Sequence, residues 1–208
     1  TKDEIKLISI NFESTKIPQL PKNSKMFIFG ESKNYDFANL VKPTSKFNTQ
    51  KGYGFDKIDL WQIRDSKIAP KAWAESLGVK SAEFSLSLPK GEYQFELIWD
   101  ELGYWETPFW NRRQIFHLGK PIRIETRSTW QDYLKDHFRF KEQLKLDPFE
   151  QLQTSLKPIK FRVNHQGRKL TLSFKGDPSG VSLNQLLVFP LTSKKENEVF
   201  KNELESFY

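Results

Sequence analysis

The chain has 208 residues, of which 37% are hydrophobic and 28% are charged, and its formal net charge is +7. This length suits one domain, or one domain with an insertion, and is sufficient to bury a core without disulfides. No stretch approaches the roughly 20 apolar residues of a membrane-spanning helix. The chain has no cysteine, which excludes thiol nucleophiles, thiolate metal sites and disulfides. The positive charge is compatible with an anionic partner without requiring one.

Aromatic residues make up 14% of the chain, with 18 phenylalanines, six tyrosines and six tryptophans. Much of this content is expected in a hydrophobic core, because each ring buries a large apolar area. Six tryptophans are nevertheless many for a chain whose periodicity is mainly that of β-strands.

The first quarter of the chain contains one alternating segment and one short apolar run. Residues 5–13 alternate between apolar and polar types and are predicted to form a strand. Residues 14–25 carry two prolines and several lysines, as loops do. A short strand is expected over 26–29, and residues 30–57 are expected to form a long surface loop or short irregular strands.

Three pairs of alternating segments predict β-hairpins, because a short stretch of turn-forming residues separates the members of each pair. The paired segments are 84–88 with 93–99, 115–118 with 122–124, and 159–163 with 170–174. Residues 183–189 are predicted to form the closing strand. Because these strands do not alternate with helices, we predict a mainly β fold, an antiparallel β-sandwich of the jelly-roll type.

Two segments break the β pattern. Apolar residues recur at helical spacing after Trp130, and a capping pattern at Asp147 predicts a second helix. We therefore expect a two-helix insertion at about 128–157 within a β-sandwich domain that spans residues 1–192. Residues 193–208 are expected to form a charged C-terminal helix or a linker.

Catalysis, metal binding and nucleotide binding have little support in the sequence. Gly30-Glu31-Ser32 is weakly similar to the nucleophile block of esterases, but no partner pattern follows it. The histidines, His117, His137 and His165, match neither a triad order nor a zinc-ligand spacing. We interpret these residues as non-catalytic. Calcium binding needs only oxygen ligands from loops, and the sequence leaves it open.

Residues 99–113 combine aromatic rings and charged groups at high density, with three tryptophans, three carboxylates and two arginines. A sugar ring packs on an aromatic face while its hydroxyls bond to carboxylates and guanidinium groups. We therefore expect a saccharide-binding loop at one end of the sandwich. Its candidate ligand-binding residues are Tyr104, Trp105 and Trp110 as platforms, with Asp100, Glu101, Arg112 and Arg113 as polar partners. Alternatively, these aromatic residues close the end of the sandwich and pack on the inserted helices; Trp99 in particular is expected to point inward.

Residues 112–146 carry nine basic and four acidic side chains. Aromatic residues interleave with these charges, as they do in proteins that bind single-stranded nucleic acid. No nucleic-acid-binding motif is present, however, and a solvated helix face is the simpler interpretation. We expect no nucleic-acid partner, although an acidic polysaccharide would suit the same charges.

Several short patterns resemble the galactose-binding-like jelly-roll modules that accompany polysaccharide lyases, esterases and glycosidases. Phe27-Ile28-Phe29-Gly30 followed by Gly52-Tyr53-Gly54-Phe55 resembles their phenylalanine–glycine strand and GYGF block. The segment 84–93 is similar to their strand with a P-x-G-x-Y turn, and 161–174 and 181–186 are similar to their later strands. The chain departs from the family in its larger helical insertion. It also has Trp99-Asp100-Glu101 where the family usually has Gly-Asp.

This resemblance implies a non-catalytic accessory module that binds a polysaccharide or another glycan and lies outside the cytoplasm, extracellular, periplasmic or at the cell surface. It also implies, in many members, a structural calcium ion. Tyr53 and Phe55 are expected to be mainly structural, with Gly52 and Gly54 in turn conformations that other residues resist. The alternative is a protein-interaction or scaffold domain of a larger extracellular protein, whose helices dock on a neighbouring domain.

Overall fold

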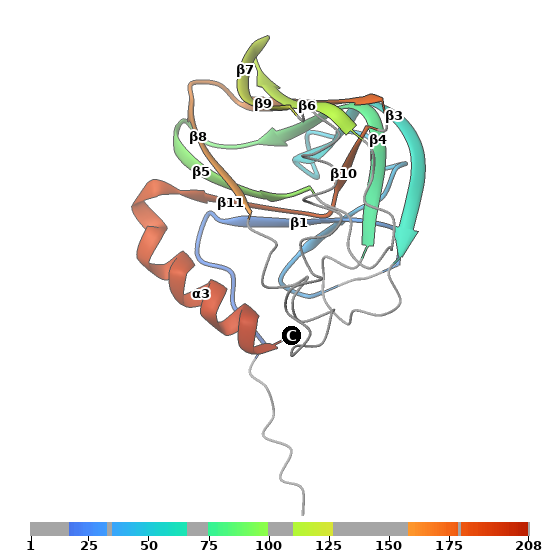
Figure 1. Ribbon diagram of the computed structural model, residues 1–208. Helices are drawn as coiled ribbons and strands as arrows, with labels where there is room; N and C mark the ends of the chain where they lie inside the picture. Colours follow the sequence, from blue (N-terminus) through green and yellow to red (C-terminus); the bar gives the residue numbers. More distant parts are fainter. Residues whose placement is uncertain are drawn as a thin grey trace, which may run out of the picture.

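The structure is a computed structural model that describes residues 17–32, 35–65, 75–99, 110–126, 158–178 and 180–207, with side chains up to residue 204. Within these ranges, eleven strands form two β-sheets, and a helix follows them at the C-terminal end (Figure 1). The predicted mainly β, antiparallel sandwich is confirmed. The strand predicted at 5–13 and the two helices predicted at about 128–157 lie outside the described residues.

We name the five-stranded sheet sheet A and the six-stranded sheet sheet B. Sheet A has the order β2 (Asn39–Val41), β1 (Lys25–Phe29), β11 (Gln185–Pro190), β5 (Gly91–Ile98), β8 (Ile159–His165). Sheet B has the order β10 (Val181–Leu183), β4 (Glu75–Ser87), β9 (Lys169–Pro178), β6 (Trp110–His117), β7 (Lys120–Thr126), and β3 (Tyr53–Asp65) also pairs with β4. All these pairs are antiparallel except β1 with β2.

The main hydrophobic core lies between the two sheets and is rich in phenylalanine. Phe29 of sheet A meets Phe84 of sheet B edge to face, with 5.2 Å between ring centroids, and Phe27 contacts the same ring at 5.3 Å. Such pairs contribute about 0.5–1.5 kcal/mol each beyond the area that they bury. Much of the high phenylalanine content is therefore structural.

The pairing of strands differs from the sequence-based prediction in two of the three predicted hairpins. β6 and β7 do form one, and Leu118 and Gly119 both have positive φ in its turn. The other two predictions are wrong, because β4 and β5 lie in different sheets, as do β8 and β9. Alternation identifies the face of a strand that is buried, but a short connection can either turn back within a sheet or cross the core to the other one.

The GYGF block opens β3, and its residues have the structural roles that were expected. Tyr53 and Phe55 belong to the core between the sheets. Gly52 and Gly54 have φ values of 76° and 146°, which confirms the expected turn conformations. A Cβ atom on Gly54 would also lie 2.5 Å from the backbone of Lys46, so both the conformation and the space require glycine.

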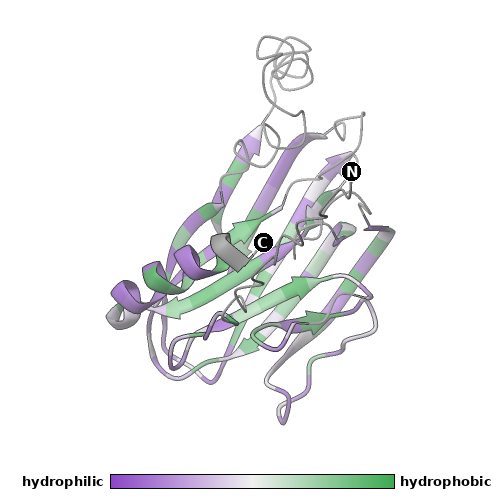
Figure 2. Ribbon diagram, turned by 90° about the horizontal axis from the view of Figure 1, so that it is seen from below, coloured by the Kyte–Doolittle hydropathy of each residue, from purple (hydrophilic) through white to green (hydrophobic). Residues whose placement is uncertain are grey.

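The expected C-terminal helix is confirmed as α3 (Lys194–Phe207), preceded by a short 3₁₀ turn, η2 (Leu191–Ser193). Figures 1 and 2 show α3 against the face of sheet A that points away from sheet B. Phe200 and Leu204 of the helix are buried there with residues such as Met26 and Phe189. The apolar face of α3 is therefore covered by the chain's own sheet.

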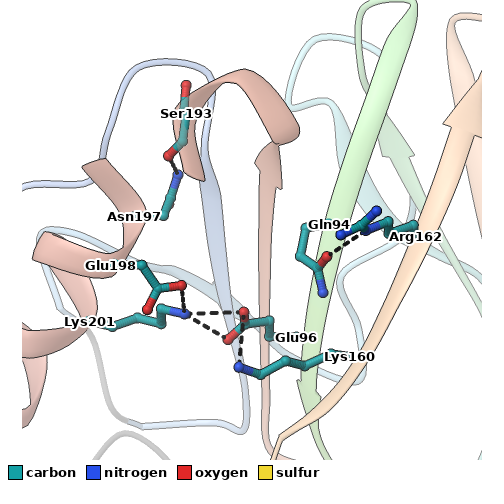
Figure 3. A network of polar contacts seen from close by, with 8 residues as sticks. All are labelled: Gln94, Glu96, Lys160, Arg162, Ser193, Asn197, Glu198 and Lys201. Carbon is teal, nitrogen blue, oxygen red and sulfur yellow. Dashed lines mark hydrogen bonds and ion pairs between the residues drawn. The ribbon is translucent and has the colours of Figure 1, made fainter. Parts of the chain in front are cut away.

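Charged side chains join α3 to sheet A around the buried carboxylate of Glu96 on β5 (Figure 3). The Nζ atom of Lys201 donates to Glu96 at 3.2 Å and to Glu198 at 2.7 Å, and Lys160 of β8 lies 3.7 Å from the same Glu96 oxygen. Burial disfavours the charged form of Lys201, but Glu198 and Glu96 outweigh it and raise the pKa of this ammonium group. The network fixes the helix on the sheet.

Candidate functional site

The two ends of the aromatic-rich segment meet at one buried cation. Trp99 follows β5 of sheet A, and Trp110 begins β6 of sheet B. The guanidinium carbon of Arg113 lies 4.4 Å from the centroid of the Trp99 ring and 4.3 Å from that of the Trp110 ring. Arginine stacks favourably on indole rings because its planar, weakly hydrated cation meets the negative face of the π system.

Hydrogen bonds complete the surroundings of Arg113. Its Nε donates to Oε2 of Glu125 on β7 at 2.8 Å, and one terminal nitrogen donates to the backbone carbonyl of Trp99 at 3.1 Å. Glu125 also accepts from the exposed Arg123 at 3.0 Å. A buried charge is tolerated only when it is paired in this way. Arg113 therefore ties the end of β5 to the beginning of β6, across the two sheets.

Of the seven candidate ligand residues, three lie among the described residues, and these three differ in their exposure to solvent. Trp110 and Arg113 are buried, with exposed fractions of 8% and 7%, and the exposed Arg112 lies between them in sequence on the outer side of β6. The remaining candidates fall in the segment 100–109, outside the described residues: Asp100, Glu101, Tyr104 and Trp105. Trp99 is buried, as its position in the alternating strand predicted.

The serine of the esterase-like tripeptide contacts a carboxylate. The Ser32 hydroxyl and the backbone N–H groups of Glu31 and Ser32 donate to Glu75, which is buried at the start of β4. A Cβ atom on Gly30 would lie 2.0 Å from a carboxylate oxygen of Glu75. Glycine at this position therefore leaves room for the buried carboxylate.

The two described histidines lie at the ends of two strands in different sheets, His117 at the end of β6 and His165 at the end of β8. Nδ1 of His117 lies 3.0 Å from the carbonyl oxygen of Thr171, and His165 is 3% exposed at the end of β8. Burial, with a smaller contribution from the charge of His117, lowers the pKa of His165. A lowered pKa keeps this imidazole neutral near pH 7.

The histidine and acidic side chains of the described residues do not cluster as metal ligands do. No three histidine or acidic side chains in these ranges are grouped so that they could hold a metal ion.

Sequence reasoning missed a shallow depression on the outer face of sheet B, the face that points away from sheet A. Its volume is about 280 Å³. The side chains that border it are Lys57, Ser81, Glu83, Phe116, Ser173 and Lys175. The signal in the sequence was only that these residues occupy the polar phase of alternating strands, which is also typical of an ordinary solvent-facing surface.

No helix among the described residues has the length and apolar character needed to cross a membrane. Comparison with models of protein families finds no match, and comparison with curated proteins finds none either.

Solved structures do resemble the fold. The crystal structure of protein YXIM from Bacillus subtilis is 13% identical, with a TM-score of 0.53 over 81% of this chain and 40% of that one. A β-glucuronidase from Bacteroides uniformis is 12% identical, with a TM-score of 0.46 over 81% of this chain and 18% of that one. The plant receptor-like kinase FER is also 12% identical, with a TM-score of 0.46 over 81% of this chain and 42% of that one.

The likeness to YXIM shows a shared sandwich fold, and the weaker likenesses add nothing to the assignment of function. The chain spans less than half the length of each of these proteins.

Proposed function

We propose that the chain is a non-catalytic carbohydrate-binding module of the galactose-binding-like type, and that it recognises a polysaccharide through the segment around residues 99–113. The observation that carries the proposal is the cluster of Trp99, Arg113 and Trp110. It brings the two ends of the segment 100–109 to one place, at the junction of sheets A and B.

The cluster supports two different roles for the residues of the segment, one structural and one in ligand contact. Trp110 and Arg113 have little exposed surface, and they contact one another, so the proposal assigns them to the base of the site. Tyr104 and Trp105 act as platforms for sugar rings, and Asp100, Glu101 and Arg112 bond to hydroxyl or carboxylate groups of the ligand. Sites built on groups whose positions are fixed by packing lose less conformational freedom on binding.

The test is the binding of the purified chain to immobilised neutral and acidic polysaccharides, compared with the Trp105→Ala variant. We expect this variant to remain folded and to bind at least about tenfold more weakly, since stacked aromatic residues dominate such contacts. Trp61→Ala is the matched control, because Trp61 is a 41% exposed tryptophan on β3, a strand that pairs with neither β5 nor β6. Equal binding by the wild type and Trp105→Ala would disprove the assignment of the site.

A protein-interaction domain is the second candidate, and one observation favours it. Trp61 and Ile63 on β3 are exposed apolar side chains, and the only named strand among the described residues that pairs with β3 is β4. On its other side β3 forms bridges at Tyr53 and Phe55, which lie at the opposite end of the strand from Trp61 and Ile63. Exposed apolar residues on an edge strand are typical of surfaces that join other proteins. An interaction domain would bind none of the polysaccharides in the same screen. α3 is less suited to such contacts, because its apolar face is already covered.

A further inference from the structure

The outer face of sheet B brings together side chains from four strands in two neighbouring rows. In one row, Lys57 of β3 is opposite Glu83 of β4, which is opposite Ser173 of β9, which is opposite Phe116 of β6. In the next row, Ser81 of β4 is opposite Lys175 of β9. Side chains in directly opposite positions share a face and lie within contact distance of their neighbours.

Small side chains form the floor of the depression, and larger side chains surround it. Ser81 and Ser173 form its floor on β4 and β9, whereas Phe116 and Lys57 flank it on β6 and β3. The inward-facing neighbours, Ala82 and Phe174, belong to the core, so the floor rests on packed structure. Figure 1 shows β6 and β9 on the layer of the sandwich away from α3.

One sugar residue is able to contact both an aromatic ring and a cation in this depression. The Nζ atom of Lys175 lies 5.7 Å from the centroid of the half-buried Phe116 ring. A pyranose whose C–H face packed on Phe116 would lie within reach of this ammonium group. The hydroxyls of Ser81 and Ser173 on the floor both donate and accept hydrogen bonds.

Three polar side chains that border the depression, Ser81, Ser173 and Lys175, differ in their hydrogen bonding from other polar side chains on this face. Farther along the same face, Ser85 bonds to Thr171 at 2.7 Å, and Lys169 bonds to Asp56 at 2.8 Å. In contrast, the hydroxyls of Ser81 and Ser173 and the ammonium of Lys175 make no hydrogen bond or ion pair with other side chains among the described residues. Their hydrogen-bonding capacity is available to a ligand.

The charges of the depression favour an anion. Lys57 and Glu83 lie 3.5 Å apart and compensate one another. Lys175 is then the one uncompensated charge among the described side chains that border the depression. An anionic group on the ligand would gain a charge-assisted hydrogen bond here, whereas a cationic group would be repelled.

We infer that this depression is a binding subsite for an anionic sugar residue, either a uronic acid or a sulfated hexose, whose ring packs on Phe116 and whose charge bonds to Lys175. The inference rests on the proposed carbohydrate binding and names its ligand class. It places this subsite on the face of sheet B, apart from the end of the sandwich where Trp99 and Trp110 lie.

The experiment measures by calorimetry the affinity of the whole chain for three probes: a galacturonate tetrasaccharide, a sulfated galactan tetrasaccharide and a neutral galactan tetrasaccharide. We expect Lys175→Met to weaken binding of at least one anionic probe about tenfold and to leave the neutral probe within about twofold. Phe116→Leu keeps an apolar side chain but removes the aromatic face, and should weaken that anionic probe and the neutral one by a similar factor. Lys195→Met on α3 is the control, because it makes the same change in net charge on the opposite side of the sandwich.

The outcomes separate this inference from the proposed function. If the wild type binds the neutral and anionic probes equally, or if Lys175→Met and Lys195→Met bind alike, the subsite is wrong while carbohydrate binding stands. If the wild type binds the polysaccharides but none of the three probes, the subsite is wrong. If it binds neither the probes nor the polysaccharides, both proposals fail. The anionic probe that loses affinity in Lys175→Met identifies the group, carboxylate or sulfate, that the lysine contacts.

Discussion

Trp99 and Trp110 share one cation, because the guanidinium carbon of Arg113 lies within 4.4 Å of both ring centroids. The two tryptophans belong to different sheets, so the contact links the two layers of the sandwich at one end. Arg113 supplies that link from the body of the fold.

Arg113→Met should destabilise the protein by about 2–4 kcal/mol, since it removes a buried, paired cation and leaves Glu125 with one fewer partner. Arg123→Met is the matched comparison, because Arg123 pairs with the same carboxylate but its side chain is 53% exposed. That change should cost less than about 1 kcal/mol. Urea denaturation of both variants measures the two free energies of unfolding, and similar losses would show that Arg113 does not link the sheets.

Gly54→Ala should destabilise the fold by at least about 2 kcal/mol, because the new Cβ meets a backbone at a conformation that alanine resists. Gly119→Ala separates the two effects: Gly119 also has positive φ, but nothing lies within 4 Å of its Cβ position. It should cost only about 1 kcal/mol. Thermal denaturation of the two variants gives the comparison, and equal costs would mean that the close approach of Lys46 is unimportant.

Phe200→Ala should destabilise the protein by about 3–5 kcal/mol, because Phe200 is 1% exposed between α3 and sheet A and its removal leaves a cavity. The neighbouring Val199 is 56% exposed, and Val199→Ala should change stability by less than about 0.5 kcal/mol. Denaturant titrations followed by circular dichroism measure both. If Phe200→Ala unfolds no more easily than Val199→Ala, α3 does not contribute its apolar face to the fold.

The lowered pKa of His165 predicts a loss of stability in mild acid. Its pKa in the unfolded chain is about 6.5, so below this pH the unfolded state takes up a proton that the folded state resists. Stability should be complete well above this pH and fall as the pH is lowered through it. His165→Gln should reduce that slope, and His117→Gln should raise the pKa of His165, which NMR titration of its ring measures. An unchanged slope in His165→Gln would assign the pH dependence to another group.

Much of the candidate site at the end of the sandwich was predictable from the sequence, but the exposure of its members was not. The composition of residues 99–113 indicated a cluster of rings and charges, and the phase of the strand correctly predicted that Trp99 is buried. Nothing local indicated that Trp110 and Arg113 are buried together. Their burial depends on Trp99 and Glu125, which belong to other strands, and a sequence pattern carries no information on which strands become neighbours.

Features that follow from local backbone geometry could be predicted from the sequence alone. The alternation of Phe84 and Leu86 with Ser85 identified the face of β4 that joins the hydrophobic core, because successive side chains of a strand point to opposite faces. The glycines at 52 and 54 marked the turn conformations, and the helical spacing of Phe200 and Leu204 marked α3.

Which strands and side chains become neighbours depends, in contrast, on the packing of the whole fold. Only the pairing order of sheet B places Phe116 beside Lys175 and Ser173, because these residues come from strands that are distant in the chain. Two of the three predicted hairpins proved to be crossings between sheets for the same reason. A strand's buried face follows from its own residues, whereas its neighbours follow from how two whole sheets pack to fill one core.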